Sequence, residues 1–225
     1  MRETDCLEHR HIAWCSDDLK AATAAVEEWG RQRWPGARVI HELRVGGCRI
    51  DIAFVQPDHI AGIEIKSAKD TLERLPEQVR QYMRELPEVW VALAPKFVTA
   101  AHDDSLPWSV GRIVVDEGRI GEAIPCGQYQ RRHDANPDVM LTAPMLHLLW
   151  RDEALWLAKW HDIAVPPRLP LHKLVKVLAR RLTGDEIVSG VCRSLRARPI
   201  RWAADPPIVD AALAPNTTEG RTDRA

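Results

Sequence analysis

Residues 49–66 constrain the fold of this chain more than any other segment. They form two short runs rich in isoleucine and valine, residues 49–55 and 60–66, separated by Gln56-Pro57-Asp58-His59. Short β-branched runs on either side of a Pro-Asp turn predict an antiparallel pair of strands. These otherwise apolar strands contain four charged residues: Arg49 and Asp51 in the first, and Glu64 and Lys66 in the second.

The spacing of these charges predicts a metal site. Side chains alternate across a strand, so Glu64 and Lys66 share one face, which Asp51 can reach from the neighbouring strand. Two converging carboxylates suit Mg²⁺ (or Mn²⁺), and the backbone carbonyl of Ile65 could add a third ligand. Such an ion activates water and neutralises phosphate charge, and Lys66 would assist. The pattern indicates hydrolysis of phosphodiester bonds; the alternative is a solvated sheet face with cross-strand ion pairs.

The flanking segments predict an α/β fold with a small mixed sheet. A helix over residues 16–34 begins with acids and carries an apolar stripe. A strand over 37–45 and a Gly46-Gly47 turn lead into the strand pair, whose strands are expected over residues 48–55 and 60–66. A helix over 70–85 precedes a nearly all-apolar strand, 89–94, which is expected to be buried on both faces. Residues 111–124 then form a small hairpin.

This order of elements, with Asp51 and Glu64-Ile65-Lys66 at its centre, resembles the PD-(D/E)XK nuclease superfamily over roughly residues 16–125. Arg49-Ile50-Asp51-Ile52, Glu64-Ile65-Lys66-Ser67 and residues 70–75 are also similar to a group of small bacterial and phage proteins assigned to that superfamily. The resemblance implies a restriction-endonuclease-like core (αβββαβ) and favours DNA as substrate. It also implies that Asp51 and Glu64 bind the metal and that Lys66 is the catalytic lysine. Ile50 replaces the proline of the superfamily's name.

Further site residues are expected around this centre. The superfamily usually has an upstream acid, for which we expect Glu42, with Glu27 or Glu28 on the first helix as the alternative. Gln78 and Tyr82 lie one turn apart on one helix face, so both could point toward the sheet edge; for Tyr82 the alternative is a polar helix face. Several superfamily members have a glutamine at the position of Gln78. Ser67 and Lys69 could contact phosphate, or simply solvate the loop.

The C-terminal part predicts a basic helical extension, residues 141–202, after a nuclease-like domain, residues 1–140. Residues 168–201 contain nine Lys or Arg against two acids. Lys173, Lys176 and Arg180 share one face of a helix over 171–182, and Arg196 lies on a following helix over 185–197. This pair could track a phosphate backbone or form a helix-turn-helix; the alternative is a merely solvated surface. Residues 203–225 are expected to form a disordered tail.

Composition sets only broad limits. No apolar stretch is long enough to span a bilayer and no signal peptide is evident, so we expect a cytoplasmic protein. The spacing of Cys6, His9, His11 and Cys15 fits no common zinc pattern. Most of the nine tryptophans are expected to pack in the interior. The competing functions are a nucleic-acid- or protein-binding module that does not cut and a transcriptional regulator; pairing of subunits into a homodimer stays open.

Overall fold

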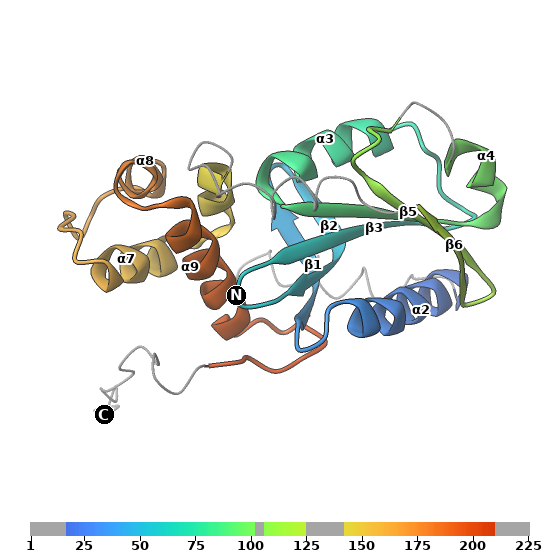
Figure 1. The fold of residues 1–225 in the computed structure, drawn as a ribbon, viewed down its shortest axis with the longest axis horizontal. Coiled ribbons are helices and arrows are strands. Elements are labelled where there is room, and N and C mark those ends of the chain that lie inside the picture. The colour runs from blue at the N-terminus through green and yellow to red at the C-terminus, as the bar shows by residue number, and fades with distance from the viewer. Residues whose placement is uncertain (1–16, 102–105, 125–141, 210–225) are drawn as a thin grey trace, which may run out of the picture.

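A six-stranded mixed sheet organises the fold (Figure 1). The computed structural model describes residues 17–101, 106–124 and 142–209. The strands lie side by side in chain order, with antiparallel pairing from β1 to β3, parallel pairing from β3 to β5, and an antiparallel hairpin at the end. Their bounds are β1 (Arg38–Val45), β2 (Cys48–Val55), β3 (Ile60–Lys66), β4 (Glu88–Leu93), β5 (Gly111–Asp116) and β6 (Arg119–Ile124).

Helices cover both faces of the sheet, which confirms the predicted α/β class. One face packs against α2 (Asp17–Arg33), and α3 (Leu75–Glu85) covers the other as the crossover between the parallel strands β3 and β4. The remaining elements are η1 (Pro95–Phe97), α4 (Val98–Ala101), η2 (Ala143–Leu148), α7 (Arg151–Trp160), α8 (Leu171–Arg181) and α9 (Gly184–Ala197).

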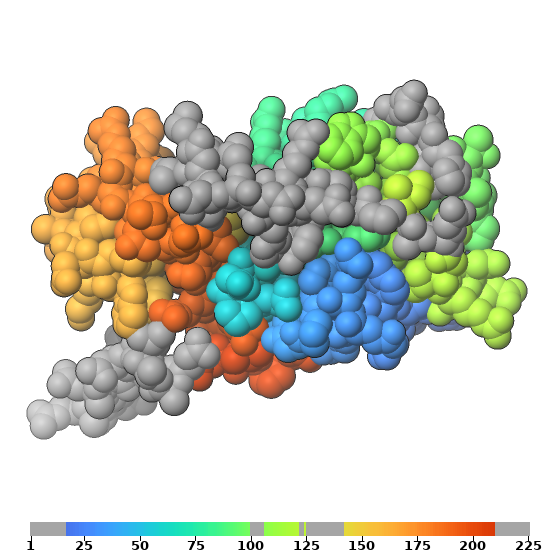
Figure 2. All heavy atoms as spheres, viewed as in Figure 1, coloured from blue at the N-terminus to red at the C-terminus, as the bar shows by residue number. Residues whose placement is uncertain are grey.

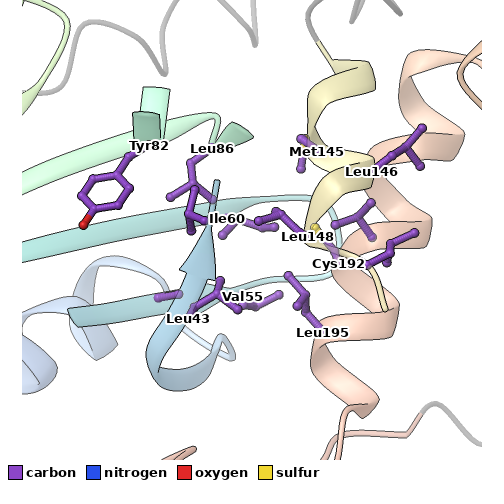
Figure 3. Packing of buried hydrophobic residues seen from close by; sticks show 14 of the residues in the cluster. Leu43, Val55, Ile60, Tyr82, Leu86, Met145, Leu146, Leu148, Cys192 and Leu195 are labelled. Carbon is purple, nitrogen blue, oxygen red and sulfur yellow. The ribbon is translucent and has the colours of Figure 1, made fainter. Parts of the chain in front are cut away.

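Alternation along the strands divides the apolar side chains between two cores. On β3, Ile63 and Ile65 join the core beneath α2, which also contains Trp34 and Trp90. The opposite core contains α3 and extends without interruption to the C-terminal helices, as Figure 3 shows. Its labelled members are Leu43, Val55, Ile60, Tyr82, Leu86, Met145, Leu146, Leu148, Cys192 and Leu195. The C-terminal helices are therefore packed against the α3 face of the sheet.

The C-terminal region differs from the prediction in two places. The apolar spacing of residues 145–160 predicts one helix, but the chain is extended at Leu149 and Trp150 between η2 and α7. Residues 203–209, predicted to begin a disordered tail, instead lie along β1: Ala203 bridges Ile40, and the Asp205 carboxylate accepts a hydrogen bond of 2.7 Å from the backbone of Val39. The rest of the predicted tail, 210–225, lies outside the described residues.

A buried arginine on β1 helps to join the C-terminal region to the sheet. The side chain of Arg38 on β1 is fully buried, and its Nη1 donates to the carbonyl oxygens of Leu195, Arg196 and Arg198 at 2.7–2.9 Å. These carbonyls belong to the last turn of α9, which has no later helical residues to satisfy them. Arg38 therefore closes α9 and anchors it on β1.

Within the parts of the chain that the structure describes, no helix combines the length and the apolar character needed to cross a bilayer.

Candidate active site

The candidate site lies where the pairing of β2 with β3 opens. Paired residues run from Val55↔Ile60 to Ile52↔Ile63 and stop before Asp51. The Asp51 carboxylate takes over as the acceptor, because its Oδ2 lies 2.6 Å from the backbone nitrogen of Ile65. The Asp51 side chain thus substitutes for a backbone carbonyl in the ladder and is held against the Glu64-Ile65-Lys66 triplet.

Glu64 lies at the centre of a hydrogen-bonded cluster. It faces α3, opposite to Ile63 and Ile65, and is only 3% exposed. Its Oε1 accepts hydrogen bonds from Lys66 Nζ at 2.6 Å and from Gln78 Nε2 at 2.8 Å. Its Oε2 lies 2.8 Å from the hydroxyl of Tyr82. The carboxylate is therefore oriented by three donors from β3 and α3.

Gln78 and Tyr82 supply two of these donors from one face of α3. The amide oxygen of Gln78 accepts from Lys66 Nζ at 3.0 Å while its nitrogen donates to Glu64, so one side chain holds both charged groups. The Tyr82 hydroxyl shares its proton between Glu64 and the carbonyl of Arg49, 2.6 Å away. Figure 3 shows this ring descending from α3 toward the sheet. Sequence alone favours a polar helix face for Tyr82, and its four-residue spacing from Gln78 is the signal that places both side chains on one face of α3.

Asp51 is in electrostatic conflict with its surroundings. Loss of water around the carboxyl group and the negative charge of Glu64 raise the pKa of Asp51 from 3.8 to about 8, although the Ile65 hydrogen bond opposes this. Burial, together with the nearby Glu64 charge and hydrogen bond, also raises the pKa of Tyr82, which keeps its hydroxyl a donor. With Asp51 ionised, the cluster would therefore have more negative charge than Lys66 can balance.

Glu42 adds to this negative charge from β1. It lies between the pairs His41↔Ile52 and Leu43↔Ile50, opposite Asp51, and has a φ of 51°, which is strained for a non-glycine residue. Its side chain is 43% exposed, with Oε2 3.9 Å from Nη1 of Arg49. Its charge is a further cause of the raised pKa of Asp51.

The alternative upstream acids do not join the cluster. Glu27 on α2 pairs with Arg31 and His41, and Glu28 accepts from Gln32. Because α2 covers the face of the sheet opposite to Glu64, both acids are separated from the site by the sheet. Of the acids proposed from sequence, Glu42 is the one that the fold brings next to Asp51.

The donor set fits a hard divalent cation. Asp51, Glu64 and the Ile65 carbonyl offer oxygen atoms, and the raised pKa of Asp51 indicates a position that lacks positive charge. Among residues 17–101, 106–124 and 142–209, no group of three or more His, Cys, Asp or Glu side chains is arranged to hold a metal ion. A cation here would therefore depend on two carboxylates, the backbone and water. The Cys6, His9, His11 and Cys15 cluster lies outside the described residues.

The residues proposed for nucleic-acid contact have different environments. Ser67 turns inward, since its Oγ donates to Asp70 at 2.7 Å, while Lys69 is exposed beside it. Lys173, Lys176 and Arg180 are exposed on α8. Arg196 Nη1 instead donates to the carbonyls of Gly36 and Val55 at 3.0 and 2.9 Å, so it stabilises the fold.

Comparison with known proteins gives one family and one structural relative. A family model described as "Bacteriophage P4 protein cII" matches residues 20–149, which include every element of the candidate site. A solved protein of unknown function from Silicibacter pomeroyi is 15% identical, with a TM-score of 0.36; the match covers 68% of this chain and 99% of that one. No curated protein matches this chain.

Proposed function

The chain belongs to the bacteriophage P4 protein cII family, and on that premise we propose that it is a phage-associated nuclease of the PD-(D/E)XK type. The proposal includes a restriction-endonuclease-like core and Mg²⁺ or Mn²⁺ as the cofactor. One observation supports the proposal: Asp51, Glu64 and Lys66 meet where β2 and β3 separate. There, burial and the charge of Glu64 raise the pKa of Asp51. Paired carboxylates with an adjacent lysine are suited to phosphodiester hydrolysis, in which water adds to phosphorus and a P–O bond breaks.

Different residues of the site would bind the cation, contact the phosphate and orient Glu64. Asp51, Glu64 and the Ile65 carbonyl would hold the cation, which supplies water activation and neutralises phosphate charge when bound. Lys66, fixed by Glu64 and Gln78 at 2.6 and 3.0 Å, would donate to a phosphate oxygen as negative charge develops. Gln78 and the Tyr82 hydroxyl keep Glu64 in one orientation.

Nucleic acid, with DNA favoured by the family resemblance, is the substrate class that we propose. Lys69 is exposed three residues after Lys66 and can contact a phosphate next to the cleaved one. On α8, Lys173, Lys176 and Arg180 offer further positive charge to the backbone. Ser67 would act indirectly, since it closes the turn with Asp70 and so positions Lys69.

The test is cleavage by the full chain. Plasmid, linear and branched DNA are incubated with wild type, Asp51→Asn and Lys66→Met in Mg²⁺, in Mn²⁺ and in EDTA. Matched controls are Asp116→Asn, at an exposed position ending β5, and Lys20→Met on α2. We expect metal-dependent cutting by wild type and both controls, and loss of at least 100-fold in the two site variants. Cutting that survives in Asp51→Asn would contradict the assignment.

A second function, binding without cleavage, is favoured by one observation. Both carboxylate oxygens of Glu64 already have protein partners, Lys66 and Gln78 on one and Tyr82 on the other. A cluster satisfied internally can be a fold-stabilising remnant instead of a metal site. DNA binding by the wild type, with no cutting in either metal ion, would favour this function.

A further inference from the structure

Two tryptophans at the ends of α7 lie on the surface. Of the eight tryptophans that the structure describes, half are exposed and half are buried or partly buried; the exposed ones are Trp108, Trp150, Trp160 and Trp202. Trp150, immediately before α7, is 50% exposed, and Trp160, the last residue of α7, is 45% exposed. By contrast, Trp34 and Trp90 are almost fully buried under α2, at 5% and 1%. A partly exposed indole is a large, rigid aromatic surface on which another planar group can stack.

Each of the two exposed indoles lies against an arginine from the α9 region. The guanidinium carbon of Arg198 is 4.4 Å from the Trp150 ring centroid, and that of Arg193 is 5.3 Å from Trp160. Trp160 also stacks on Trp156, with centroids 5.6 Å apart and planes inclined at 26°. Both indoles thus border the seam between α7 and α9. Ten helical residues separate them by about 15 Å along this seam.

The adjoining helix α8 carries only positive charge. It has no acidic residue between Leu171 and Arg181, and its exposed side chains include Lys173, Lys176, Arg180 and Arg181. Helices α7, α8 and α9 pack together as one end of the molecule, which forms the yellow and orange end of Figure 2. This end therefore combines exposed aromatic faces with a cationic helix.

We propose that this end of the molecule binds unpaired nucleic acid, with bases stacked on Trp150 and Trp160 and phosphates contacted by α8. Every base has a π-face that can stack on an indole, and the arginine beside each of these indoles adds a cation–π contribution. Charge complementarity selects a polyanion, since an apolar protein partner would leave the cations of α8 uncompensated. A duplex can use α8 but hides its bases from the indoles.

This inference deepens the proposed function, because it makes a single-stranded segment part of the substrate. It can nevertheless be tested without cleavage. Fluorescently labelled oligo(dT) and a duplex of equal length are titrated with the full chain in EDTA, and binding is followed by anisotropy at two salt concentrations. The variants are Trp150→Ala/Trp160→Ala and Trp150→Phe/Trp160→Phe; the matched control is Trp108→Ala, at a 62% exposed tryptophan before β5.

We expect the double alanine variant to bind oligo(dT) at least tenfold more weakly, while the phenylalanine variant keeps most of the affinity and duplex binding changes less than threefold. The double variant Lys173→Glu/Lys176→Glu should bind both oligo(dT) and the duplex more weakly than wild type. If the alanine variant does not fold, the test uses quenching of intrinsic tryptophan fluorescence by oligo(dT) instead. This quenching should be smaller in the phenylalanine variant than in wild type.

Wild type that fails to bind oligo(dT) would overturn the inference. So would an alanine variant that binds like wild type, equal losses for oligo(dT) and duplex, or an equal loss in Trp108→Ala. Because no divalent ion is present, none of these results depends on whether Asp51 and Glu64 support hydrolysis. Binding with no cleavage would retain this site and remove the nuclease proposal.

Discussion

Replacing Asp51 with asparagine should stabilise the protein, and more strongly at higher pH. In the folded protein the pKa of Asp51 is about 8, against 3.8 as its ordinary value. At pH 7 the unfolded chain therefore gains about 4 kcal/mol by ionising this residue, whereas the folded protein gains almost none. Asparagine has no charge to lose, and its side-chain oxygen can still accept from the backbone of Ile65.

The pH window follows from the direction of the shift. The folded state binds the Asp51 proton more tightly than the unfolded state, so wild-type stability falls as pH rises from about 4 to about 8. The advantage of Asp51→Asn should be small near pH 4, grow by about 4 kcal/mol between pH 5 and pH 8, and then level off. A difference of 4 kcal/mol corresponds to roughly 10 °C in Tm for a chain of this size.

Urea unfolding at half-unit steps from pH 5 to pH 9 measures this difference, with Asp116→Asn as the matched control at an exposed carboxylate. The control should show a pH-independent difference within about 0.5 kcal/mol. A stability gap for Asp51→Asn that is constant with pH, or a variant less stable than wild type at pH 8, would refute the electrostatic conflict.

Three other outcomes follow from the contacts described. Mg²⁺ or Mn²⁺ binding at pH 7 should release close to one proton, because the cation displaces the proton of Asp51; calorimetry in buffers of different ionisation enthalpy measures this, and no release would contradict it. Tyr82→Phe should lower the free energy of unfolding by about 1–3 kcal/mol, since Glu64 loses a buried donor, and unchanged urea unfolding would argue against that bond. Arg38→Met should lower it by about 3 kcal/mol or more, because the carbonyls of Leu195 and Arg198 lose their donor and that of Arg196 keeps only the Ile208 nitrogen. Arg44→Met, at an exposed position, should change it by less than about 0.5 kcal/mol.

The strands at the site could be predicted from local chemistry. Residues 48–55 and 60–66 were predicted with the bounds that the structure gives, because a Pro-Asp turn and β-branched residues define both ends. The contact of Asp51 with the backbone of Ile65 could not be predicted, since it depends on where the pairing of two strands stops. The strained backbone of Glu42 is likewise imposed by its neighbours, because no local signal favours a positive φ for glutamate.

The C-terminal helices show the limits of periodicity more clearly. The break before α7 is held by Glu153, which accepts from the backbone of Trp150 at 2.6 Å and from Arg198 Nε at 2.7 Å, 45 residues away in the chain. The spacing of apolar residues near Trp150 does not predict that Arg198 contacts Glu153. Charge alone predicts that Arg196 contacts nucleic acid, but its guanidinium donates to the backbone carbonyls of Gly36 and Val55. Charge content predicts a basic region but does not separate surface cations from those that join elements.

The attachment of residues 203–209 to β1 has a consequence for the order of synthesis. A ribosome delivers β1 early, yet the segment that covers its outer edge, through Ala203 and Asp205, emerges more than 150 residues later. Until then the nascent sheet has an uncovered strand edge, the kind of surface that invites pairing with other chains. This edge of the sheet can therefore be covered only after Ala203 and Asp205 have been synthesised.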